Sequence, residues 1–535
     1  MSMGRWSDGG VQGELFLTSG DFPRSPGHVF YDRLNRLLAE AKFDPFVESL
    51  CSPYYEDRSQ PGRPSVPPSV YFRMMFVGYF EGIDSQRGIA WRCADSFSLR
   101  TYLGLSWNDS SPDHSSLSRT RKRLPESVHQ SVFDWVLKLC ADRHLLTDPS
   151  VVGVDSTMIE ANAAMRSIVR KDTKQGYLDY VKSLMREADG ITKNGSPAKS
   201  STDKNEPPIN PPSGDASATT PSAPVASSTQ ESTAKTECST MSESTPKPEP
   251  TLAEIIRFDR NRKGKTCSNA DWEARHDKDA RIAKMKDGRT RLAYKVEHVV
   301  DLKSEVILSA EIYAADQSDH QTGIDSVMSA RCHLTSAGLE MTIDACAEDK
   351  GYHSREQLAL AELYSLRTYV AEPDRPHRLR WVDRPKEEQL AVHSNRRRIK
   401  GERGKALQRR RSEVTERSFA HLCETGGSRR SWLRGFGNIR KRYPLAAAAR
   451  NLGLLMRKKF GMGKPRTLQS NGSSNGGDGG GNSDGESGPD KPGGPKSIMK
   501  RIWDQLLAIP NQISHVRDSL RVFELRHDNT YAFAW

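Results

Sequence analysis

Residues 151–159 read VVGVDSTMI, and at this stretch the apolar pattern of the chain changes. Apolar and β-branched residues alternate here as in a β-strand, whereas the preceding 150 residues are patterned as helices. Asp155 lies inside the predicted strand. A carboxylate buried beside Val152 and Val154 is costly without a role, which favours a functional Asp155. The alternative is that Asp155 only ends a strand or caps a turn.

After this strand, strand and helix patterns follow one another. The segments 291–300 and 305–313 are joined by DLKS and predict a β-hairpin. Further strands are expected at 341–345 and 367–371, and helices at 319–334, 354–363, 413–423 and 445–459. This order predicts a mixed α/β layer fold with an antiparallel hairpin at one edge of its sheet.

The first 150 residues predict short helices at 28–41, 69–80, 83–93, 96–103 and 115–124. The stretch SPD (111–113) predicts a turn and helix N-cap before the last of them. That last helix carries four basic residues, Arg119, Arg121, Lys122 and Arg123. Short helices ending in a basic one are typical of a helix-turn-helix module that binds DNA. A helical bundle with a solvated basic face fits the same pattern.

The 535 residues are too many for one core, and two segments are too polar to fold. Residues 190–250 contain no Phe, Trp or Tyr, and 468–497 are rich in Gly and Ser. The predicted organisation is a helical DNA-binding domain (12–150), an α/β domain in two parts (151–189 and 251–467) around a disordered insertion (190–250), a flexible linker (468–497) and a C-terminal tail (498–535).

The net charge of +12 and the pI near 9.2 favour a polyanionic partner such as nucleic acid. An anionic membrane would satisfy charge alone, but no apolar run is long enough to span a bilayer. The N-terminus lacks the pattern of a signal peptide.

Eight cysteines occur singly, without a CxxC pair, which argues against a zinc ribbon or a disulfide framework. We therefore expect a cytoplasmic protein.

Residues 392–442 hold 16 Lys or Arg against 4 Asp or Glu. Glu413 and Glu416 nevertheless lie inside RRRSEVTERSF (409–419). One interpretation is a charge-balancing salt bridge. The other is that Glu416 is a metal ligand while neighbouring arginines hold DNA; these are Arg409, Arg410, Arg411 and Arg417. We rank Glu416 before Glu413 because Phe419 and Ala420 put it beside the buried face of the predicted helix.

Asp349 follows the predicted strand at 341–345, and Gly351 permits a tight turn just after it. Asp344 and Glu348 compete with it. Asp155, Asp349 and Glu416 would together supply the hard oxygen ligands that Mg²⁺ prefers. Two such ions can clamp the attacking and leaving oxygens of a phosphoryl transfer. The sequence therefore suggests a site for two Mg²⁺ ions, with Mn²⁺ as a possible substitute.

Other polar residues have less specific interpretations. Lys350 and His353 could touch a phosphate or pack the turn after Asp349. Arg430 and Arg434 interleave with aromatic residues, as in surfaces that grip single-stranded nucleic acid, or lie in an ordinary packed loop. His298 is expected to be a satisfied core histidine, and Asp319 a helix N-cap.

Six motifs follow one another along the chain. The first two are GRPSVPPSVYFRMMFVGYFEGIDSQRGIAWRCADSFSLRTYLGL (62–105) and SPDHSSLSRTRKRLP (111–125). The other four are GVDSTMIEANAA (153–164), DGRTRLAYKVEHVVD (287–301), DKGYHS (349–354) and TERSFAHLCETGGSRRSWLRGFGNIRKRYPLAAAARNLGLLMRK (415–458). In this order the motifs resemble bacterial insertion-sequence transposases of the DDE type, whose catalytic domain is RNase H-like.

The resemblance implies that Asp155, Asp349 and Glu416 bind two divalent ions. It also implies an enzyme that nicks the inverted repeats at the ends of a mobile element and joins the freed 3′-OH to target DNA. A homodimer on double-stranded DNA, acting at the bacterial nucleoid, is expected by analogy. A related branch carries Arg and Lys where this chain has Ser412 and Cys423, so that branch's hairpin-forming steps do not transfer. The alternative function is a catalytically inactive DNA-binding regulator derived from a transposase.

Overall fold

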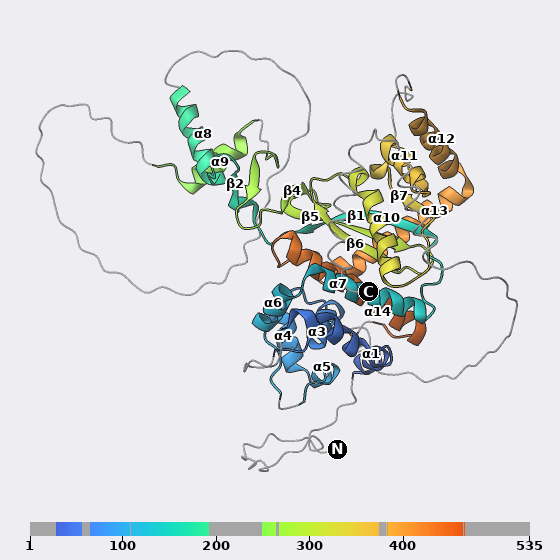
Figure 1. The fold of residues 1–535 in the computed structure, drawn as a ribbon. Helices are drawn as coiled ribbons and strands as arrows, with labels where there is room; N and C mark the ends of the chain where they lie inside the picture. Colours follow the sequence, from blue (N-terminus) through green and yellow to red (C-terminus); the bar gives the residue numbers. More distant parts are fainter. Residues whose placement is uncertain are drawn as a thin grey trace, which may run out of the picture. The chain divides into compact units, whose positions relative to one another are not determined.

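The strand predicted around Asp155 is β1 (Val151–Glu160), and it lies inside the main sheet of the computed structural model (Figure 1). It pairs antiparallel with β5 (Thr290–Asp301) on one side and parallel with β7 (Ala345–Glu348) on the other. β5 also pairs antiparallel with β6 (Ile307–Ala314), and β7 pairs parallel with β8 (Arg367–Val370). The predicted hairpin and mixed sheet are confirmed.

Helices cover both faces of this sheet. Alternate residues of β1 point to opposite faces, and residues on each face contact a helix. On one face, Gly153 packs against two side chains of α13 (Glu402–Phe419). On the other face, Ser156 donates a hydrogen bond to the first residue of α10 (Asp319–Ser336). The structure therefore confirms the predicted mixed α/β layer fold, the arrangement expected of an RNase H-like domain.

Three further helices complete this part of the chain, and they pack on α13, β6 or β8. These are α11 (Arg355–Leu363), α12 (Lys386–Lys400) and α14 (Phe436–Phe460). The remaining elements are β2 (Ile168–Arg170), β3 (Trp272–Ala274), β4 (Arg281–Lys284), α8 (Tyr177–Ile191), α9 (Leu252–Asn261), the 3₁₀ turns η2 (Met165–Ser167) and η3 (Lys350–Tyr352), and the π-helical turn η4 (Ala420–Glu424).

Several predicted boundaries were wrong. The strand expected at 341–345 is β7, which begins only at Ala345. Ala345 pairs with Val151, and Val151 is where the parallel partner β1 begins. The helix expected at 413–423 is the end of the longer α13 followed by a π-helical turn. The helix expected to begin at 445 runs through Pro444, since the residues around the proline are buried against other helices. The sequence did not predict α12, because its many charged residues outnumber the few apolar residues of its buried stripe.

The N-terminal part is all-helical, as predicted. Its elements are α1 (Val29–Glu40), α2 (Phe43–Cys51), the 3₁₀ turn η1 (Ser52–Tyr54), α3 (Pro68–Glu81), α4 (Gln86–Asp95), α5 (Phe97–Tyr102), α6 (His114–Arg123) and α7 (Glu126–Asp142). The side chain of Asp113 caps α6 by accepting from the Ser116 backbone N–H at 2.7 Å, which confirms the predicted N-cap. α7 packs along α14 and thereby joins the helical part to the RNase H-like part.

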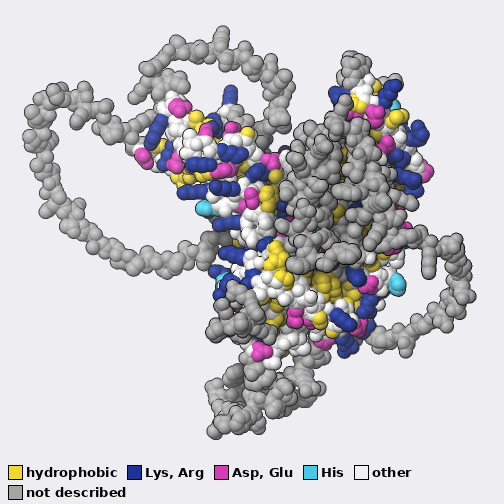
Figure 2. Space-filling model, in the orientation of Figure 1, with side chains coloured by type: hydrophobic (Ala, Val, Ile, Leu, Met, Phe, Trp, Pro, Cys, Tyr) yellow, Lys and Arg dark blue, Asp and Glu magenta, His cyan; other side chains and the backbone are white. Residues whose placement is uncertain are grey.

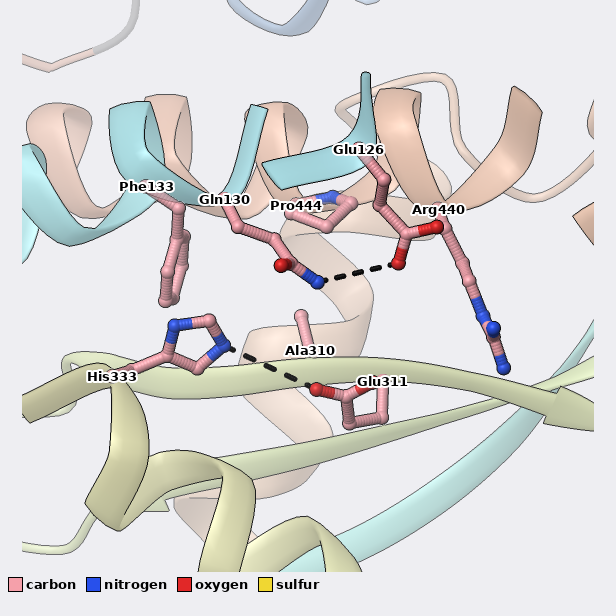
Figure 3. A pocket seen from close by; sticks show the side chains of 8 residues that line it. All are labelled: Glu126, Gln130, Phe133, Ala310, Glu311, His333, Arg440 and Pro444. Carbon is pink, nitrogen blue, oxygen red and sulfur yellow. Dashed lines mark hydrogen bonds and ion pairs between the residues drawn. The ribbon is translucent and has the colours of Figure 1, made fainter. Parts of the chain in front are cut away.

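A second contact between these parts is an ion pair at a small cavity. His333 of α10 lies with Nδ1 2.6 Å from Asp134 Oδ1 of α7, and its Nε2 is 4.0 Å from Glu311 Oε1 of β6. Figure 3 shows His333 and Glu311 facing each other across this cavity, beneath Gln130 and Phe133. The pKa of His333 is raised, because the two carboxylates outweigh the opposing effect of burial.

The structure describes residues 28–55, 65–106, 109–191, 249–263, 267–373, 381, 384–463 and 465. The predicted insertion lies outside these residues except at its two ends, and the linker and C-terminal tail lie wholly outside them. Across the described part of the chain, all seven cysteines are free thiols. No described helix combines the length and the apolar character that crossing a bilayer requires.

Candidate active site

Asp155 points from β1 toward α13, and its side chain is 25% exposed. Its Oδ2 accepts a hydrogen bond at 3.2 Å from Thr415 Oγ1, which also donates to the Arg411 backbone oxygen at 2.9 Å. The same Oδ2 lies 3.6 Å from Arg411 Nη1. The backbone N–H of Ser156 donates to its other oxygen at 2.9 Å. Burial raises the pKa of Asp155, although the charge of Arg411 acts in the opposite direction. A half-buried carboxylate is thus held against one helix by a hydroxyl and a cation.

Asp349 is the first residue after β7, and its exposed side chain caps η3 by accepting from the Lys350 N–H at 2.7 Å. The last paired position of the parallel strands is Gly153 with Ala347. Asp155 and Asp349 each follow two residues later in the chain, Asp155 still within β1 and Asp349 directly after β7. The register therefore brings both aspartates to the edge of the sheet at which β7 ends, while β1 continues beyond it to Glu160.

Glu416 lies on α13 directly after Thr415, and its side chain is exposed. Its Oε1 accepts a hydrogen bond from Ser412 Oγ at 3.1 Å. Gln408, one turn before Ser412, donates to the backbone oxygen of Glu348 at 2.9 Å. Residues four apart lie on the same side of a helix. Gln408, Ser412 and Glu416 therefore form a row along α13 that leads from the end of β7 to Glu416.

Glu413 behaves differently from Glu416. It forms ion pairs with Arg410, at 3.0 Å, and with Arg417. Hydrogen bonds from these arginines lower the pKa of Glu413. Among the residues that the structure describes, Glu416 makes no ion pair. The salt-bridge interpretation therefore applies to Glu413, while Glu416 remains available to another ligand.

The two acids that competed with Asp349 are placed less favourably. Asp344 precedes β7, and its backbone N–H bonds Ser150, so it lies at the opposite end of the strand from Asp349. Glu348 is buried and points to the α10 side, near Gly323. Burial raises the pKa of Glu348 to about 8. These placements favour Asp349 as the exposed carboxylate of this edge.

Asp319 is an acid near this site whose role the sequence did not predict. Ser318 is the residue that precedes and caps α10, so the prediction of Asp319 as N-cap was wrong. The Asp319 carboxylate instead accepts a hydrogen bond from Ser156 and forms an ion pair with Lys295. His298, by contrast, is the satisfied core histidine that was predicted: it is buried and bonds Ser418 and Tyr443. Burial lowers its pKa well below the usual value.

The donor set suits a hard divalent cation. Within the described ranges, no group of three or more His, Cys, Asp or Glu side chains is already arranged to hold a metal ion. Asp349 and Glu416 are nevertheless exposed, and within those ranges neither forms an ion pair. Asp155 is held by one hydroxyl, one backbone amide and the guanidinium group of Arg411 at 3.6 Å. Carboxylates with these contacts can exchange them for a cation.

Two of the predicted DNA-binding arginines are buried instead. Arg121 is 7% exposed, and its Nε donates to Asn438 Oδ1 of α14 at 3.1 Å. Arg411 is 8% exposed and contacts Asp155. Both are surrounded by protein, so their predicted place on a DNA-facing surface was wrong. A basic run on a helix does not itself reveal which member faces inward.

The other predicted basic residues are exposed or half-buried. Arg410 and Arg417 both pair with Glu305, and Arg430 lies over Trp432 and near Glu160. Those with substantial exposure are Arg119, Lys122, Arg123, Lys350, Arg409 and Arg434, and His353 is half-buried. Figure 2 shows Lys and Arg side chains gathered over α8 and α9 and over the part that carries α12 and α13.

Comparisons with known proteins agree with this architecture. Residues 21–123 match the family model Transposase domain (DUF772), and residues 265–452 match the family model Transposase DDE domain. The second match includes Asp349 and Glu416, whereas Asp155 lies between the two matched stretches. Searches of curated proteins and of solved structures found no match. The two matches cover the helical part and most of the RNase H-like part in the order that the motifs predicted, and the chain belongs to the DDE-type insertion-sequence transposases.

Proposed function

We propose that this DNA transposase cleaves the ends of its element and transfers the freed 3′-OH to target DNA, using Asp155, Asp349 and Glu416 to hold two Mg²⁺ ions. The relationship that carries the proposal is the register of β1 and β7, which brings Asp155 and Asp349 to the edge at which β7 ends. Beside it lies α13, whose Thr415 binds Asp155 and whose next residue is Glu416. This proposal assigns three acids that are far apart in the chain to the end of β7 and the helix beside it.

The family generally uses a divalent metal ion. Bound at this edge, two Mg²⁺ ions would activate the attacking oxygen and stabilise charge on the departing 3′ oxygen. The protein's own contribution is positioning. Thr415 and the Ser156 amide orient Asp155, and Arg411 balances part of its charge. Mn²⁺ prefers the same oxygen ligands and is expected to substitute.

The DNA partner is double-stranded: the inverted repeats at the element ends, and the target. Exposed basic side chains near the site, Lys350 and Arg409, are suited to bind phosphates that flank the reacting bond. Arg119, Lys122 and Arg123 of α6 form a second basic group. We further propose that the protein acts as a homodimer on DNA, because two element ends must be processed together.

The experiment is incubation of the full chain with DNA that carries the element's end, in Mg²⁺ and in EDTA. Cleaved and joined products in Mg²⁺ alone support the proposal. Cleavage without joining would identify a metal-dependent nuclease instead. Retarded DNA without any cleavage would identify a DNA-binding regulator. A denaturing gel separates cleaved from joined products, and a native gel shows retarded DNA, so a single labelled substrate distinguishes the three outcomes.

A further inference from the structure

Asp319 contacts three separate elements of the RNase H-like fold. One carboxylate oxygen, Oδ1, accepts a hydrogen bond from Ser156 Oγ of β1 at 2.8 Å and lies 2.7 Å from Lys295 Nζ of β5. The other oxygen, Oδ2, lies against Gly351 in the turn after β7, where an added Cβ would approach it to 2.7 Å. This one carboxylate therefore lies between a strand and a turn that the chain places far apart.

Lys295 fixes the position of Asp319. Its side chain is fully buried, and its ammonium group donates to Thr322 Oγ1 at 2.8 Å. Glu297 is 3.8 Å away and is also fully buried, with a pKa that burial raises to about 7. A buried ammonium needs a nearby counter-ion. Asp319 gives the shorter contact, so it is the principal partner of Lys295 and cannot rotate away without leaving that charge unpaired.

The contacts of Asp319 lie next to two proposed metal ligands. Ser156 directly follows Asp155, and Gly351 is two residues after Asp349. We propose that Asp319 is a positioning residue, which sets the segments of Asp155 and Asp349 at the correct separation for a divalent cation. The proposal rests on the proposed function of those two aspartates. It also explains the glycine at 351, since any side chain there would displace the Asp319 carboxylate.

The test is Mn²⁺ binding by the full chain without DNA, measured by titration calorimetry. Residues that orient metal ligands typically change affinity about 10–100-fold when altered, so Asp319→Asn should bind Mn²⁺ at least about tenfold more weakly than wild type. Asp325→Asn is the matched control, because it makes the same substitution on an exposed position of the same helix. It should leave the affinity unchanged.

Asp319→Asn removes the main counter-ion of Lys295 and can therefore reduce folding. Ser156→Ala keeps that ion pair and removes only the hydrogen bond to β1. It should weaken Mn²⁺ binding several-fold while the midpoint of thermal unfolding stays within a few degrees of wild type. A role restricted to stability would move the midpoint and leave the affinity of the folded protein unchanged.

The possible failures are distinguishable. If wild type binds no Mn²⁺, the proposed function itself is contradicted. If wild type binds Mn²⁺ and both Asp319→Asn and Ser156→Ala bind it equally well, Asp319 is not a positioning residue, and the assignment of Asp155 and Asp349 stands unaffected.

Discussion

Thr415 of α13 donates a hydrogen bond to Asp155 of β1 across 3.2 Å, although 260 residues separate the two in the chain. This contact joins the middle of the sheet to the helix that carries Glu416. It also defines which face of the sheet the proposed chemistry uses, since the same helix covers Gly153.

Glu416→Gln should reduce DNA cleavage by about a thousandfold or more while DNA binding persists, because a metal ligand supplies several kcal/mol of transition-state stabilisation. The measurement is single-turnover cleavage of end-bearing DNA. Glu413→Gln is the control, since it makes the same change one turn earlier and loses only exposed pairs with Arg410 and Arg417. Its rate should stay within about twofold of wild type. Equal rates for the two variants would contradict the assignment of Glu416.

Thr415→Val should lower the cleavage rate by about tenfold, because Asp155 loses the hydroxyl that orients it. Valine keeps the shape of threonine, so DNA binding should not change. Thr415→Ser retains a hydroxyl and should remain near wild type. If Val and Ser give the same rate, the hydrogen bond does not matter for catalysis.

Arg409→Ala should weaken DNA binding and reduce the salt dependence of the affinity by about one unit of slope, as expected when one phosphate contact is lost. The measurement is DNA affinity at several salt concentrations. Arg121→Ala is the comparison: this side chain is buried against Asn438, so its loss should destabilise the fold without changing the slope. An unchanged slope for Arg409→Ala would place that residue away from DNA.

The contact between α7 and α10 should weaken as the pH rises. The pKa of His333 is above its usual 6.5 in the folded protein, so its ion pairs contribute fully below 6.5 and are lost as pH rises through the raised value. The measurement is the free energy of unfolding in urea between pH 6 and about 9.

Buried Glu297 and Glu348 also lose protons in this range, with pKa values of about 7 and 8. The informative quantity is therefore the difference between wild type and His333→Gln. That difference should be largest at pH 6 and shrink as the pH rises. A difference that is constant with pH would exclude the ion pair as its source.

The sequence predicted much of the fold because its apolar periods are local. The alternation around Asp155 and the two strands joined by DLKS identify β1, β5 and β6 from neighbouring residues alone. The start of β7 was placed less well, because this parallel strand begins where its distant partner β1 begins. The run through Pro444 depends on burial by other helices, which no local pattern contains.

The acids of the candidate site were likewise recognisable as motifs, but their partners were not. Nothing near Thr415 in the chain indicates that it binds Asp155, and Arg121 faces Asn438 only because α6 and α14 meet in the fold. Asp319 looked like a helix cap because it begins a helix. Its bridge from β1 to β5 appears only when those strands are paired.

Whether Asp349 holds a metal ion can be measured by replacing its carboxylate with a thiolate. A thiolate binds Mg²⁺ poorly and softer Mn²⁺ better. Asp349→Cys should bind end-bearing DNA normally, fail to cleave it in Mg²⁺ and recover cleavage in Mn²⁺. Cleavage by Asp349→Cys in Mg²⁺ at the wild-type rate would contradict the proposed metal site.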